Sequence, residues 1–216
     1  MNIDTLILSG GGPAGVAYTS IFQALYDKGI LSPDLKGIKE IITTSIGIVM
    51  SLCLLLKLDN SIIREISQRY DISNLLDTSE ISIDGLLFDS GLYETSGIQK
   101  ICASLVGNVL HQNDVTLQEL YDQTNIKLSV KVLNITQRHY VFLSHETDPD
   151  LSVITLAQMT TAIPILFKPI SYKDNLYCDG GIVHGYPSGY DPSPYYLGIY
   201  MNSGIDPIHM SEIPLF

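Results

Sequence analysis

Residues 5–18 read TLILSGGGPAGVAY and place a short apolar strand directly before a glycine-rich turn and a helical pattern. Glycines at such a turn let the backbone bend sharply and bring its amides close to a ligand. Two classes of protein begin in this way. A dinucleotide-binding fold seats a pyrophosphate on a G-x-G-x-x-G turn, and a hydrolase uses the glycine amides as an oxyanion hole.

The rest of the chain continues to alternate strands with helices. Strands are predicted at residues 5–8, 39–44, 127–134, 140–144, 176–178 and 195–201. Helices are predicted at 17–28, 46–56, 60–70, 96–106, 116–123 and 153–161, and 81–92 has the pattern of an irregular apolar loop. This alternation predicts an α/β fold, a three-layer sandwich with a mostly parallel central sheet. Because no repeat or linker interrupts the pattern, we expect residues 1–216 to form a single domain.

Composition limits the partners and the location. The chain has 12 lysines and arginines against 23 acids and a net charge of −11, so nucleic acid is not an expected partner. The apolar run at 46–56 is too short to span a bilayer, because a spanning helix needs ~20 apolar residues. Three widely spaced cysteines and the lack of a signal peptide before the first strand indicate an intracellular protein, cytoplasmic or peripheral to a membrane. No histidine pair has metal-ligand spacing, so no metal is expected.

A dinucleotide site makes a second demand that this chain does not meet. An acid should follow the glycines by about 20 residues, at the end of the second strand, to bind a ribose hydroxyl. Asp34 lies in the loop before that strand, and Glu40 opens the strand instead of closing it. The strand ends in Thr43-Thr44-Ser45-Ile46-Gly47. We therefore expect no nicotinamide or flavin cofactor.

The hydrolase interpretation predicts what stands at this position. A serine on a sharp turn between a strand and a helix is held with its oxygen exposed, and Gly47 lets the two elements approach closely. The helix N-terminus offers its dipole to developing negative charge. A serine that simply caps a helix explains Ser45 equally well. The acid at the end of a later strand, Asp179, followed by Gly180 and Gly181, shifts the balance towards the hydrolase.

At this point the sequence resembles the patatin-like phospholipase family. Residues 10–15, GGGPAG, resemble the family's glycine-rich oxyanion-hole motif, and 43–47, TTSIG, resemble its G-x-S-x-G nucleophile motif. Residues 179–181, DGG, match its D-G-A/G motif. Residues 157–169 resemble its segment of small residues around Ala-Ile-Pro, and Pro187 falls where the family often has Asn-Pro.

The resemblance implies a lipid acyl hydrolase of the phospholipase A or lysophospholipase type, which cleaves fatty-acyl esters without a cofactor. Ser45 would be the nucleophile and Asp179 the base of a Ser–Asp dyad. A loop of three glycines would form the oxyanion hole, namely Gly10, Gly11 and Gly12, with Gly10 shaping the loop. The implied partner is a lipid or phospholipid ester, reached by transient contact with a membrane surface.

Two positions depart from the family pattern. Thr43 replaces the first glycine of G-x-S-x-G and either tightens or distorts the turn. Ala14 stands where the family typically has Arg or Lys, which weakens the case for a phospholipid headgroup. These departures motivate an alternative, a protein of this fold with weak or lost activity that serves as a scaffold. A triad is a further alternative, with His184 as the histidine nearest in sequence to Asp179.

Overall fold

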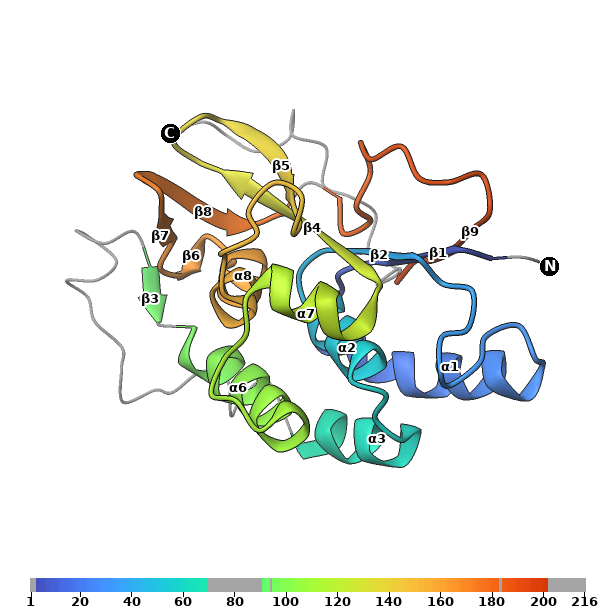
Figure 1. Ribbon diagram of the computed structural model, residues 1–216. Coiled ribbons are helices and arrows are strands. Elements are labelled where there is room, and N and C mark those ends of the chain that lie inside the picture. The colour runs from blue at the N-terminus through green and yellow to red at the C-terminus, as the bar shows by residue number, and fades with distance from the viewer. Residues whose placement is uncertain (1–2, 70–90, 94, 183, 202–216) are drawn as a thin grey trace.

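The computed structural model describes residues 3–69, 91–93, 95–182 and 184–201. The strands are β1 (Thr5–Leu8), β2 (Glu40–Thr43), β3 (Gly91–Tyr93), β4 (Lys127–Asn134), β5 (His139–Leu143), β6 (Ile165–Phe167), β7 (Ile170–Tyr172), β8 (Asn175–Asp179) and β9 (Tyr196–Ile199). The helices are η1 (Gly12–Ala17), α1 (Tyr18–Asp27), α2 (Gly47–Leu55), α3 (Asn60–Arg69), α6 (Ser96–Leu110), α7 (Leu117–Thr124) and α8 (Val153–Thr161). Figure 1 shows their arrangement.

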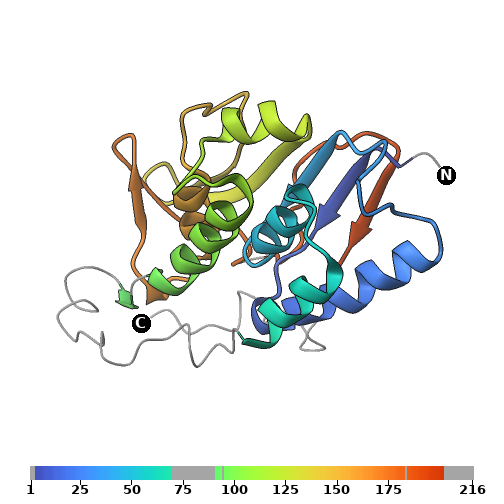
Figure 2. The same cartoon turned by 60° about the horizontal axis from the view of Figure 1, so that its bottom comes forward.

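The described strands include a central sheet of seven, in the order β7-β8-β4-β2-β1-β9 with β5 on the other edge of β4. β1, β2, β9 and the first half of β4 run parallel, and the arrows of β1 and β9 point the same way in Figure 2. β5, β7 and β8 join in antiparallel pairs. The α/β class, a central sheet flanked by helices, is confirmed.

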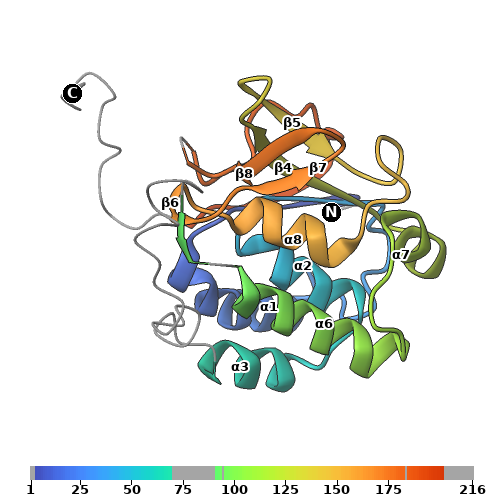
Figure 3. The same cartoon turned by 90° about the vertical axis from the view of Figure 1, so that its left-hand side faces the viewer.

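Helices cover the sheet in successive layers. α2 and α8 lie nearest to the sheet, and α6 and α3 lie beyond them (Figure 3). Every residue of α2 is buried, because its sides face the sheet, α6 and α8. This explains the run at 46–56, which is apolar all round. Within the described ranges, no helix is both long and apolar enough to cross a membrane.

Most of the predicted elements are confirmed, and the differences have local causes. β4 and α8 have the predicted bounds, and Thr116 and Glu119 form the capping box that begins α7. The helix predicted at 17–28 is preceded by the short helix η1, whose glycines and proline hide its pattern. β3, β6 and β7 escaped prediction because strands of three residues carry too little alternation. Most of the predicted loop at 81–92 lies outside the described residues.

Candidate active site

The turn between β2 and α2 holds Ser45 in an unusual backbone conformation. Its φ is 52°, in the left-handed region that costs a non-glycine residue roughly 1–2 kcal/mol. Only 7% of Ser45 is exposed, and α2 begins two residues later. A strained serine between a strand and a helix N-terminus has the geometry of a nucleophile elbow.

Thr43 fits this turn without displacing it. Its hydroxyl donates to the Leu8 carbonyl at 3.0 Å, which ties the end of β2 to the end of β1. A Cβ placed on Gly47 would lie 2.9 Å from the Ser9 carbonyl oxygen and closer still to the Thr43 hydroxyl. The threonine therefore fills the space where the strand and the helix approach, and Gly47 is the residue that makes the approach sterically feasible.

Asp179 is the last residue of β8 and accepts a hydrogen bond from Ser45 directly. The Ser45 Oγ to Asp179 Oδ2 distance is 2.8 Å, and the Gly181 amide donates to Asp179 Oδ1 at 2.7 Å. Burial raises the pKa of Asp179 to about 6, while the Gly181 amide, the Ser45 hydroxyl and the charge of Lys131 act in the opposite direction. The carboxylate is thus a stronger base than an exposed aspartate.

The two residues meet because of the register on β4. β2 pairs with β4 up to Thr43, opposite Val130. β8 runs the other way and pairs with β4 from Val132, opposite Asp179. β5 occupies the other edge of β4 over Val130 to Asn134, so β2 and β8 share one edge. Their carboxyl ends meet head-on around Lys131, which brings Ser45 and Asp179 together.

The glycine loop lies against Ser45. A Cβ on Gly10 would be 2.8 Å from the Cβ of Ser45, and the Gly10 amide donates to the Gly185 carbonyl at 2.7 Å. Gly10 therefore shapes the loop, and its amide is not available to a ligand because it donates to Gly185. The amides of Gly11 and Gly12 have no hydrogen-bond partner among the described residues, and Gly12 has a φ of 51°. These two amides are therefore the donors of the loop that are available to a ligand.

Two residues of the site were missed by sequence reasoning. Thr160 accepts a hydrogen bond from the Ser45 amide at 2.8 Å. Lys131 is 3% exposed, and its Nζ lies 4.3 Å from the centre of the Tyr140 ring. Burial lowers the pKa of Lys131, and the Asp179 carboxylate opposes that shift. A lysine between two valines in the middle of the strand 127–134 was the available signal for the second of them.

His184 is exposed, and among the described residues it makes no hydrogen bond to Ser45 or Asp179. Within the described part of the chain, the two oxygens of Asp179 accept from Ser45 and Gly181. The serine hydroxyl thus contacts a carboxylate without an intervening imidazole. In the same part of the chain, no group of three or more His, Cys, Asp or Glu side chains lies together in a way that could hold a metal ion.

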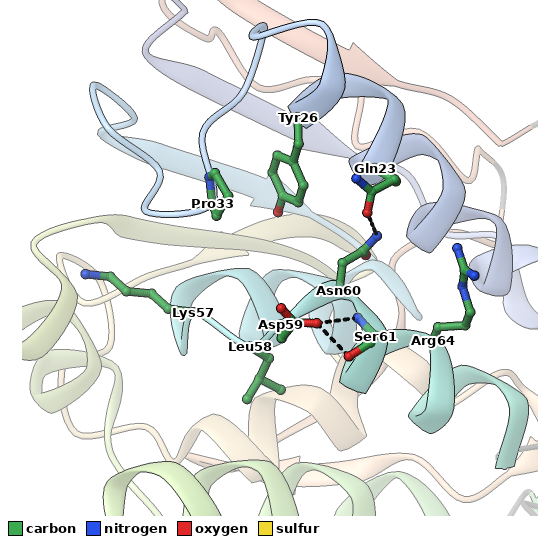
Figure 4. A pocket seen from close by; sticks show the side chains of 9 residues that line it. All are labelled: Gln23, Tyr26, Pro33, Lys57, Leu58, Asp59, Asn60, Ser61 and Arg64. Atoms are coloured by element: carbon green, nitrogen blue, oxygen red, sulfur yellow. Dashed lines mark hydrogen bonds between the residues drawn. The ribbon is translucent and has the colours of Figure 1, made fainter.

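A second Ser–Asp pair lies in a pocket of about 520 Å³ at the far end of α2 (Figure 4). Asp59 Oδ1 accepts from the Ser61 amide at 2.8 Å and from its hydroxyl at 2.6 Å. Both residues are exposed, and the hydrogen bonds from Ser61 lower the pKa of Asp59. This pair caps α3 and provides a weakly basic carboxylate, so it serves as an internal comparison for Ser45 and Asp179.

Curated relatives with similar sequences come from two viruses. The chain is 28% identical over 188 residues to "Probable lipid hydrolase 463L" of Invertebrate iridescent virus 6, which covers 85% of this chain and 61% of that protein. It is 26% identical over 185 residues to "Uncharacterized protein R571" of Acanthamoeba polyphaga mimivirus, covering 86% and 60%. The chain therefore spans about three fifths of the length of these relatives.

Solved structures share the fold. VipD from Legionella pneumophila matches with a TM-score of 0.64 and 20% identity, over 92% of this chain and 49% of that one. ExoU in its heterodimeric complex with SpcU, from the type III secretion system of Pseudomonas aeruginosa, matches with a TM-score of 0.54 and 22% identity, over 76% and 36%. The family model described as patatin-like phospholipase matches residues 6–190, a range that contains the glycine loop, Ser45 and Asp179. The chain belongs to the patatin-like phospholipase family.

Proposed function

We propose that this chain hydrolyses the acyl esters of lipids, with Ser45 as nucleophile and Asp179 as base. The observation that carries the proposal is the 2.8 Å hydrogen bond from Ser45 Oγ to the buried Asp179 carboxylate, made from a left-handed turn. Membership of the family and the similarity to a probable viral lipid hydrolase support a lipid ester as substrate. The finer type, phospholipase A or lysophospholipase, belongs to the same proposal.

The chemistry would proceed in two steps through an acyl-enzyme. Asp179 takes the hydroxyl proton as Ser45 Oγ bonds to the ester carbonyl carbon, and the carbonyl oxygen becomes an oxyanion. The Gly11 and Gly12 amides would stabilise that charge. The carbon–oxygen bond to the alcohol then breaks, and the alcohol leaves with the proton. Water attacks the acyl-enzyme with the same base and releases the fatty acid and Ser45.

Ala14 bears on which part of the lipid is recognised. It lies exposed on η1, beside the glycine loop, and the chain has no charged residue from Thr5 to Tyr26. Tight recognition of a phosphate commonly uses Arg or Lys. We therefore propose that the loop presents an uncharged surface and that the acyl ester, more than an anionic headgroup, determines binding.

Fluorophosphonate labelling tests the nucleophile. We expect the pure protein to form one adduct, with fluoride displaced by Ser45 Oγ, and mass spectrometry to locate it on that residue. Ser45→Ala should abolish the adduct and esterase activity. Ser61→Ala is the matched control and should retain both, because Ser61 hydrogen bonds an exposed carboxylate. An adduct elsewhere, or none on the folded protein, would favour the scaffold alternative.

The pH dependence tests the base. Because Asp179 has a pKa of about 6 and must be ionised to accept a proton, kcat/KM should rise with pH below about 6 and level off above it. The measurement is kcat/KM for a soluble uncharged ester between pH 5 and 8. Activity recovered at pH 8 after incubation at pH 5 excludes irreversible unfolding, and an unchanged circular dichroism spectrum at pH 5 excludes reversible unfolding. A flat profile across this range would contradict the assignment of Asp179.

A further inference from the structure

The C-terminal end of α8 contacts both halves of the dyad through their backbone amides. The Ser45 amide donates to the Thr160 hydroxyl oxygen at 2.8 Å. The Asp179 amide donates to the carbonyl of Ala162, the residue after α8, at 3.0 Å. Thr160 and Ala162 have no solvent exposure, so water does not compete for either bond. One short segment, residues 160–162, thus contacts both Ser45 and Asp179, through the Thr160 side chain and the Ala162 backbone.

The Thr160 hydroxyl is oriented for this role by a further hydrogen bond. It donates its own proton to the Lys131 carbonyl at 2.9 Å, so its lone pairs are available to the Ser45 amide. That carbonyl lies in the gap on β4 between the end of β2 pairing and the start of β8 pairing. The Thr44 hydroxyl donates to it as well, at 3.2 Å. The Lys131 carbonyl therefore accepts hydrogen bonds from both threonines at the point where β2 and β8 meet.

The left-handed conformation of Ser45 makes the acceptor at Thr160 important. A residue in this region stays there only when its surroundings hold it. The amide of Ser45 is removed from the sheet ladder and buried, and without an acceptor it would be left unsatisfied. In the described structure, the Thr160 hydroxyl oxygen accepts the hydrogen bond of this amide.

We propose that Thr160 is a positioning residue, whose hydroxyl holds Ser45 in its left-handed conformation and in register with Asp179. The consequence for catalysis rests on the proposed function, whereas the positioning itself does not. Among the described residues, the Thr160 hydroxyl makes no hydrogen bond to the hydroxyl of Ser45 or to the carboxylate of Asp179, and it acts through the Ser45 amide.

The experiment compares three variants. Thr160→Val removes the hydroxyl at nearly equal volume, and Thr160→Ser retains it. Thr161→Val is the matched control, because the Thr161 hydroxyl donates within α8, to Ala157 O at 2.7 Å. We expect Thr160→Val to lower kcat about 100-fold with little change in KM, since small misplacement of a reacting group has effects of this order. Thr160→Ser and Thr161→Val should stay near the parent.

Amide hydrogen exchange separates this inference from the proposed function. Loss of one hydrogen bond should raise the exchange rate of the Ser45 amide about tenfold or more in Thr160→Val, and not in the other two variants. This readout needs no catalytic activity. If the parent protein proves inactive but the exchange changes as expected, the positioning role stands and the hydrolase proposal fails.

Unchanged exchange at Ser45 in folded Thr160→Val overturns the positioning role, whatever the activity. A drop in kcat that Thr160→Ser does not rescue also overturns it, because the hydroxyl would then not be the cause. If Thr160→Val does not fold, Thr160→Ala removes the same hydroxyl with less crowding of the elbow, and the same two outcomes decide.

Discussion

Asp179→Asn is expected to lower kcat/KM at pH 8 by about 10³-fold, within the range attributed to general bases. Asparagine can still accept from the Gly181 amide, and its NH₂ group can donate to Ser45. The site would therefore keep its shape while losing the group that takes the hydroxyl proton. The measurement is steady-state hydrolysis of a soluble ester, together with the rate of fluorophosphonate labelling at Ser45.

The same substitution should not destabilise the fold at pH 8. Burial raises the pKa of Asp179 from an ordinary value of 3.8 to about 6 in the folded protein. As pH rises between these values the unfolded chain loses its proton first, so the folded state loses stability by up to about 3 kcal/mol. An uncharged asparagine avoids that loss. Urea unfolding at pH 8 should thus give a midpoint at or above that of the parent.

Asp59→Asn is the matched control for the loss of activity. Like Asp179, Asp59 accepts a hydrogen bond from a serine hydroxyl, in this case that of Ser61. Unlike Asp179, it is exposed and has a lowered pKa. Its replacement should leave kcat/KM unchanged within about a factor of two, because surface substitutions have small effects. Full activity in Asp179→Asn would exclude Asp179 as the base and direct attention to His184.

Gly180→Ala is expected to have the largest effect on stability. A Cβ at this buried position would lie 2.6 Å from the Lys131 carbonyl carbon and closer still to its oxygen, and 2.9 Å from the Thr44 hydroxyl. Backbone atoms of β4 cannot rotate away as a side chain can. Relief requires β8 and β4 to separate, so we expect a loss of about 3 kcal/mol, the upper part of the range for overpacking.

Thermal unfolding measures this loss, which should lower Tm by roughly 6–12 °C for a chain of this size. Gly107→Ala is the control. Gly107 lies in α6, and a Cβ there would come no closer than 3.7 Å to the Gln112 carbonyl. Alanine is the better helix former, so Gly107→Ala should leave Tm unchanged or raise it. Equal Tm values for the two variants would contradict the close approach of β8 to β4.

Sequence alone was sufficient where the signal is local. The periodicity of 127–134 and 153–161 predicted β4 and α8 with their observed bounds, because the alternation of a strand and the turn of a helix are recorded in neighbouring residues. Ser45 at the end of a strand and Asp179 at the end of another are local features of the same kind. So is the glycine loop, whose composition indicated a tight turn.

Other features required the whole fold. Nothing in the local pattern of residues 40–43 or 175–179 specifies that β2 and β8 run towards each other along one edge of β4, since register depends on partners far along the chain. The commitment of the Gly10 amide to Gly185, and the bond from Ser45 to Thr160, join residues distant in sequence. Sequence by itself therefore placed Ser45 and Asp179 at the ends of two strands, and the family resemblance predicted that they carry the chemistry. Tertiary structure alone decided that they meet, and which further residues hold them there, because hydrogen bonds and burial depend on distances that the chain acquires only when it folds.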